Sequence, residues 1–233
     1  MRHVVIPFRR QRRAPDPERV AQFADMGRRL QREREDAGPI ADRILAETGR
    51  VNLGSLTECP ELRNAGVLDH LAKLISEELP RDLAYAEHLA AVAVEISERL
   101  PSAAYPEVLV KQLRVHALAD LATVRRTMKQ FELAIEAVER AFIILDGACL
   151  AHDQALVTIE LALTYRDMGS YPVKVRELLA ACANTLRDHG DEKQAARAES
   201  LTDQWVGWVE STHPRKEAPL MRPRGGWFWT GGA

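Results

Sequence analysis

Apolar residues recur at steps of three and four along most of residues 65–211, and this spacing predicts amphipathic helices rather than strands. The first helix covers about 65–79 and the second about 82–100, with Pro80 between them because proline cannot continue a helix. A long third helix begins near Glu107, after a loop that contains two prolines. The pattern therefore predicts an all-α protein built from antiparallel helix pairs.

Two consecutive helix–turn–helix units occupy Val115–Gly190. Each has a helical apolar pattern, a short break before an aromatic residue (Phe131 or Tyr171) and a second helical pattern. Such a unit cannot bury its apolar face alone, so about three must stack, and the weaker pattern at 65–100 supplies the third. The small residues expected to let the helices approach closely are Ala122, Ala134, Ala141, Ala162 and Ala181. A further helix after Gly190 is predicted to close the array with the stripe Ala195, Ala198, Leu201, Trp205 and Trp208.

Residues 16–49 predict a helical hairpin on the N-terminal side of this array. Its first helix runs to about Ala37, and a shorter second helix starts at Gly38 and ends at Gly49, a common C-cap residue. The loop at 50–64 is the predicted boundary before the repeat domain. The apolar stripe expected to pack the first helix is Val20, Phe23, Met26 and Leu30.

The two units resemble the tetratricopeptide repeat, most specifically in the last unit and only weakly before residue 107. The matching positions of the last unit are Leu161, Ala162, Tyr165, Gly169, Tyr171, Leu178 and Ala181. Those of the middle unit are Leu118, Leu121, Ala122, Phe131, Ala134, Ile135 and Ala141. The chain departs from the family pattern at Arg125, Lys129 and Lys174. Over about 65–210 the resemblance implies a short right-handed α-solenoid with added N-terminal helices and a C-terminal capping helix.

The same resemblance implies a concave groove lined by the first helix of each unit, where a partner polypeptide would bind. Arg126 and Arg166 could hold a carboxylate there, because a guanidinium offers a fixed fork of donors. The alternative is a solvated helix face with intramolecular pairs, such as Arg126 with Asp120 or Glu160. The predicted groove residues are His116, Asp120, Thr123, Arg126, Thr127, Glu160, Leu163, Arg166 and Asp167.

A second resemblance points to a different function. The segment from Gly27 to Gly49 is similar to the first two helices of the helix-turn-helix domain of phage-repressor-like regulators, with Leu30, Gly38 and Ile44 at matching positions. Pro39 departs from that pattern, and the residues that follow lack a recognition helix. A DNA-binding regulator that uses about 26–56 and a repeat sensor domain is therefore the alternative hypothesis.

Charge and composition reduce the classes of partner to be expected, but they do not identify one partner. The net charge is −2, so overall attraction to nucleic acid is not indicated. Residues 1–15 form a basic arm with five arginines, and residues 214–233 form a tail rich in proline and glycine; both are predicted to be disordered. Scattered cysteines and histidines indicate neither a metal site nor a cofactor, and no catalytic motif is present. His152, Asp153 and the loop at 188–191 are interpreted as helix-capping and loop positions.

We therefore expect a cytoplasmic, non-enzymatic scaffold or adaptor that binds a protein or peptide partner. No run of residues is long and apolar enough to suggest a membrane span. Self-association through an uncovered edge of the array is the second partner prediction. Nucleic acid is not an expected partner.

Overall fold

The computed structural model describes residues 16–48, 59–148, 150–169 and 173–212, and within them every regular element is helical. This confirms the predicted all-α class. The basic arm 1–15, the tail 214–233, Tyr171 and the side chains of Trp205 and Trp208 lie outside the described part. The elements are α1 (Pro17–Thr48), the 3-10 turn η1 (Pro60–Leu62), α3 (Ala65–Glu78), α4 (Leu83–Glu98), α5 (Glu107–Thr127), α6 (Phe131–Leu145), α7 (Ala151–Asp167), α8 (Val173–Asp188) and α9 (Glu192–Thr212).

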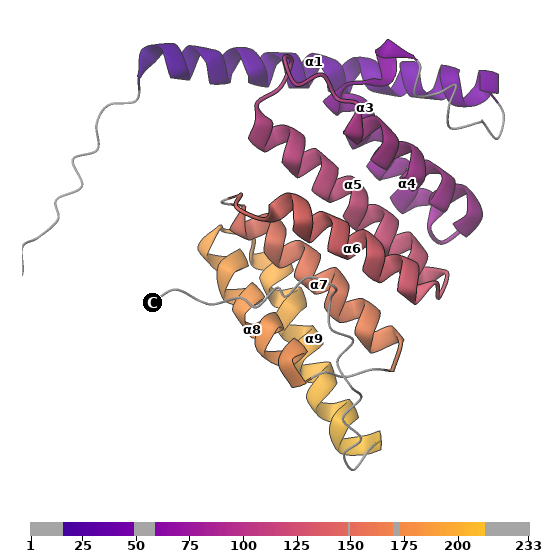
Figure 1. Cartoon of the computed structure of the whole chain (residues 1–233), viewed down its shortest axis with the longest axis vertical. Helices are drawn as coiled ribbons and strands as arrows, with labels where there is room; N and C mark the ends of the chain where they lie inside the picture. The colour runs from indigo at the N-terminus through magenta and orange to yellow at the C-terminus, as the bar shows by residue number, and fades with distance from the viewer. Residues whose placement is uncertain (1–15, 49–58, 149, 170–172, 213–233) are drawn as a thin grey trace, which may run out of the picture.

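From α3 to α9, each helix packs against the next, and α5 also contacts both α3 and α7. The helices follow one another along the molecule from α3 towards α9, and α1 lies across the α3 end (Figure 1). Local sequence sets several of the helix starts. The side chains of Asn64, Asp82 and Asp191 accept hydrogen bonds from backbone amides in the first turns of α3, α4 and α9, as N-cap residues do.

Three helix ends share one backbone conformation. Lys129 after α5, Gly169 after α7 and Gly190 after α8 all have positive φ, at 61°, 68° and 79°. The amide of each residue donates to the carbonyl three residues earlier at 2.9 Å, as in a Schellman cap. Lys129 thus occupies the left-handed position that the other two turns give to glycine.

Apolar side chains form two clusters, one built mainly from α1 and α3–α6 and the other from α7–α9. Ala122, Ala134, Ala141 and Ala162 are buried as predicted. The prediction for Ala181 is wrong, because that residue is exposed. The buried residues of α8 are instead Leu179, Cys182, Ala183 and Leu186.

The predicted hairpin at 16–49 is wrong, because α1 is one continuous helix that includes Pro39. The burial of Ala37 and Ala41 one turn apart explains how the helix continues past a residue that lacks an amide donor. These alanines lie on the part of α1 that packs on α3. The two backbones come very close at Gly66, where an added Cβ would lie 2.1 Å from the carbonyl oxygen of Glu33.

Only part of the apolar stripe predicted for α1 packs against other helices. Met26 and Leu30 pack against the first cluster, whereas Val20 is 49% and Phe23 is 74% exposed. Figure 1 shows the reason, since the N-terminal part of α1 extends past the helices beneath it. The apolar periodicity of a helix identifies its apolar face, but it does not show along what length of the helix another helix covers that face.

Candidate functional site

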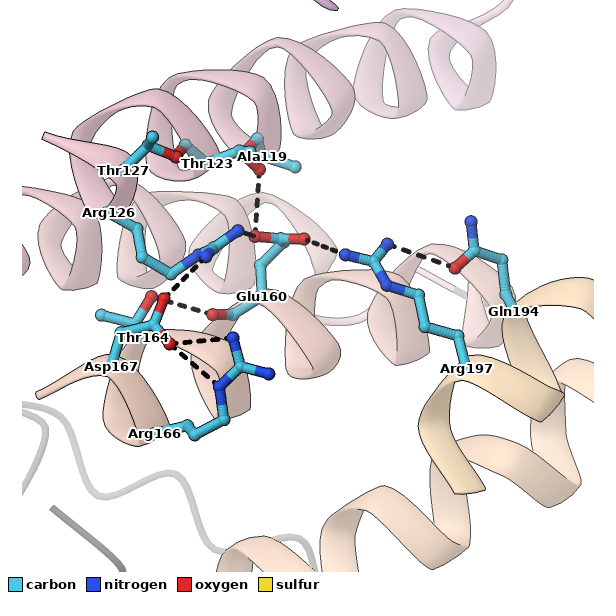
Figure 2. Close-up of polar contacts among 10 residues, drawn as sticks. All are labelled: Ala119, Thr123, Arg126, Thr127, Glu160, Thr164, Arg166, Asp167, Gln194 and Arg197. Carbon is cyan, nitrogen blue, oxygen red and sulfur yellow. Dashed lines mark hydrogen bonds and ion pairs between the residues drawn. The ribbon is translucent and has the colours of Figure 1, made fainter. Parts of the chain in front are cut away.

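The nine predicted groove residues lie on α5 and α7, which are in contact, and the structure brings several of them together at this junction. Arg126 is the centre of the contact (Figure 2). One terminal nitrogen of its guanidinium lies 3.4 Å from Glu160 Oε2, and the other donates to Asp167 Oδ2 at 2.8 Å. The side chains of Arg126 and Glu160 are each only 12% exposed. The guanidinium is therefore engaged within the protein.

This geometry decides between the two sequence interpretations of Arg126. The intramolecular pair with Glu160 is present, and within the described residues Arg126 forms no pair with Asp120. Arg166 lies against its neighbour Asp167, donating from Nε at 2.9 Å. Both arginines of the proposed carboxylate clamp already contact carboxylates of this chain, which favours the intramolecular alternative.

The predicted groove residues Leu163, Thr127 and Thr123 also contact other parts of the protein. Leu163 is buried in the second apolar cluster and cannot line a groove. The hydroxyl of Thr127 donates to the Thr123 carbonyl at 2.8 Å. The Thr123 hydroxyl itself lies 3.0 Å from both the Ala119 carbonyl and Glu160 Oε2. Of these contacts, the one between Thr123 and Glu160 joins α5 to α7, and the Thr127 bond lies within α5.

Helix α9 supplies a contact that sequence reasoning missed. Arg197 NH2 lies 3.6 Å from Glu160 Oε1, so arginines from two different helices flank one carboxylate (Figure 2). The sequence shows that Arg197 lies on the polar side of its helix. It does not show that Glu160 on α7 is the residue that Arg197 contacts.

A second polar group lies nearer the N-terminal end of α7. Asp153, which is only 2% exposed, accepts hydrogen bonds from His116 Nε2 at 2.8 Å and from Gln112 at 3.0 Å. The hydrogen bond to Asp153 raises the pKa of His116. Burial acts to raise the pKa of Asp153, but the hydrogen bonds from His116 and Gln112 outweigh it, so that pKa is lowered. The sequence suggests a capping role for Asp153, and the structure shows that it instead fixes the orientation of His116.

A hollow with a volume of about 250 Å³ lies between α1, α3 and α5. Its lining is mostly apolar and small, including Gly66, Ala72 and Ala117, while Asp69 and Gln112 are among its polar groups. Such a combination can accept an apolar group and orient it through a few polar contacts. The complete lining is Leu30, Arg34, Ala65, Gly66, Leu68, Asp69, Ala72, Ala93, Leu109, Gln112, Leu113, His116, Ala117 and Asp120.

Asp120 is the one predicted groove residue, apart from His116, that lines this hollow. Burial raises the pKa of its carboxyl group to about 6, and the nearby charge of Glu160 acts in the same direction while His116 opposes it. Among the residues that the structure describes, none forms a hydrogen bond or ion pair with this carboxyl group. Asp120 is partly buried, and among the described residues its carboxyl oxygens are not fully withdrawn from solvent, so a group in the hollow can reach them.

No three His, Cys, Asp or Glu side chains in the described ranges are grouped closely enough to hold a metal ion. None of the helices in those ranges combines the length and the apolar character needed to cross a bilayer. His152 lies 3.0 Å from Asp191, and Asp191 caps α9, which supports the capping role predicted for that loop. Comparisons of the chain with protein-family models, with curated proteins and with solved structures found no match.

Proposed function

We propose that this chain is a non-enzymatic, tetratricopeptide-like scaffold that binds a partner polypeptide in the hollow between α1, α3 and α5. The observation that carries the proposal is the hollow itself, with its floor of small apolar residues and its polar groups on α1, α3 and α5. Ligand-binding pockets combine a mostly apolar lining with a few placed polar groups.

Two features of the fold support the repeat-like part of the proposal. The first helices of the three units, α3, α5 and α7, contact one another through α5, so they lie on one continuous face. The turns after α5 and α7 place Lys129 and Gly169, forty positions apart, in the same left-handed conformation. These two features support the proposal that the helix pairs stack as an α-solenoid.

The proposed contact surface differs from the groove expected from the sequence. Arg126, Glu160 and Asp167 contact one another at the α5–α7 junction. The proposed surface therefore lies closer to the N-terminus of α5, from Leu109 to Asp120. There, His116 and Asp120 from α5 lie on the same hollow as residues of α3 and α1. Helix α1 thereby forms one wall of the proposed site.

A displayed library of random peptides tests the proposal, because selection from it requires no named partner. Selected peptides should bind the full-length protein and lose at least about tenfold in affinity when Ala72→Trp fills the hollow, because about 1.4 kcal/mol of lost contact corresponds to that factor. Ala180→Trp on the exposed side of α8 is the matched control and should leave the Kd unchanged. Equal binding by wild type and Ala72→Trp, with both proteins folded by circular dichroism, would contradict the proposal.

The DNA-binding alternative has less support. A helix-turn-helix requires a turn between its first two helices, and α1 runs without interruption through Gly38 and Pro39. A gel-shift assay with the full-length protein at rising salt tests this alternative directly. A true phosphate-contacting surface loses affinity steeply with salt, so an absence of binding at low salt removes the alternative.

A further inference from the structure

The unpartnered carboxyl group of Asp120 points to the chemistry of the ligand. We propose that the hollow between α1, α3 and α5 binds a short extended peptide segment that presents a lysine or arginine side chain to Asp120. This inference rests on the proposed function and adds the class of side chain that the site recognises.

Of the carboxylates near the α5–α7 junction, Asp120 is the one that no cationic side chain among the described residues contacts. The four carboxylates of this region are Asp120, Asp153, Glu160 and Asp167, and the arginines that contact them are Arg126, Arg166 and Arg197. Each of the arginines contacts Glu160 or Asp167, and Asp153 has Gln112 and His116 as donors. Asp120 alone has no hydrogen-bond donor among the described residues, so a cation from outside would complete the set.

The charged groups elsewhere around the hollow are already compensated. Across it, Arg34 of α1 lies 3.4 Å from Asp69 of α3, which also accepts from Lys73 at 3.1 Å. On α5, His116 faces Asp153, and α4 contributes only Ala93 to the lining. The electrostatic preference of the hollow is therefore set at its Asp120 end.

The shape of the hollow fits a chain in extended conformation. Its lining follows α5 from Leu109 to Asp120, a rise of roughly 16 Å at 1.5 Å per residue. An extended peptide covers that length with about five residues. The small side chains of Ala72 and Ala117 in the lining leave room for the methylene stem of a lysine or arginine, which can lie on apolar surface while its charged end reaches a carboxylate.

The test uses the peptides selected against the full-length protein. We expect the selected sequences to share a lysine or arginine at one fixed position, and replacing it with norleucine should weaken binding about tenfold or more. Asp120→Asn should cause a similar loss for the original peptide and little for the norleucine peptide. Asp203→Asn, at an exposed site on α9, is the matched control and should not change the Kd.

Reversing the charge at Asp120 is the most discriminating test. In Asp120→Lys, peptides with glutamate at the fixed position should bind more tightly than those with lysine. For wild type, lysine peptides should bind more tightly as pH rises from 5 to 7, whereas Asp120→Asn should show a weaker dependence. Because the pKa of His116, which also lines the hollow, is raised from 6.5 and its charge also depends on pH, the pH series is repeated with His116→Gln.

The outcomes separate this inference from the proposed function. If Ala72→Trp abolishes binding but Asp120→Asn does not, the hollow is the binding site and its preference for a cation is refuted. If selected peptides carry no shared positive charge, the inference fails in the same way. If Ala72→Trp has no effect on any peptide, the proposed function fails as well.

Discussion

Arg126 on α5 and Glu160 on α7 form an ion pair 3.4 Å apart that is almost withdrawn from solvent, at the junction between two apolar clusters. Arg126 also contacts Asp167, and its Nε atom is buried without a partner. The junction of α5 and α7 is therefore held by a polar network.

Arg126→Ala should lower the free energy of unfolding by about 1–3 kcal/mol, because it leaves Glu160 and Asp167 without their shared cation. Urea denaturation monitored by circular dichroism measures the change. Arg140→Ala removes an exposed ion pair with Glu98 and serves as the control, with an expected cost below about 1 kcal/mol. Equal costs for the two variants would show that the buried network contributes nothing beyond a surface pair.

Lys129→Gly should raise the melting temperature, with a gain of up to about 1 kcal/mol, because glycine adopts positive φ without the steric cost that a Cβ imposes. The reciprocal change Gly169→Ala should cost about 1 kcal/mol. Open space surrounds Gly169, so its effect comes from the backbone alone. A destabilised Lys129→Gly protein would mean that the lysine side chain makes a stabilising contact.

Gly66→Ala should be strongly destabilising, by about 3 kcal/mol or more, because the added methyl group meets the backbone of α1 at Glu33. The matched change Gly27→Ala has no atom within 4 Å and should stabilise α1 by about 0.5–1 kcal/mol. Thermal unfolding of both variants tests whether α1 docks on α3 in solution. A neutral Gly66→Ala would rule out the close approach of the two helices.

Asp120→Asn should stabilise the unliganded protein near neutral pH, because burial disfavours the charged carboxylate. The pKa of Asp120 is raised to about 6 from 3.8. Its contribution to stability is therefore fully present below pH 3.8 and is lost as the pH rises through about 6. We expect a difference of about 1–3 kcal/mol between variant and wild type at pH 7, vanishing below about pH 4. Urea midpoints at several pH values measure it, and a constant difference would contradict the burial of Asp120.

His116 should titrate above its usual pKa of 6.5, because it donates to the carboxylate of Asp153. Its stabilising contribution is present below pH 6.5 and is lost as the pH rises through the raised value. Proton NMR of the imidazole measures this directly, and Asp153→Asn should return the pKa towards 6.5. His189, whose ring hydrogen-bonds a backbone carbonyl, provides an internal reference signal. An unchanged His116 pKa in Asp153→Asn would contradict the pairing.

The local sequence alone determined the helices from residue 65 onward. Apolar spacing, the two prolines before α5 and polar caps such as Asn64 and Asp82 act within one or two turns, so they can be read without a structure. Of the two helices that the same reading assigned to the expected groove, α5 lines the hollow and α7 does not. The reading misjudged Gly38 and Pro39, because a proline alone predicts a break, whereas α1 continues through both residues and buries Ala37 and Ala41 on either side of them.

Only the tertiary structure decided which polar residues remain available to a ligand. Arg126, Glu160 and Arg197 come from α5, α7 and α9, and their charges cancel through contacts across helices that helical periodicity does not encode. Asp120 is likewise a charged residue on a helix. The packing of α1, α3 and α5 places it in the lining of a hollow, where no described residue donates a hydrogen bond to it. A helical pattern determines which face of a helix is polar, whereas the helices packed against that face determine which of its charges are compensated.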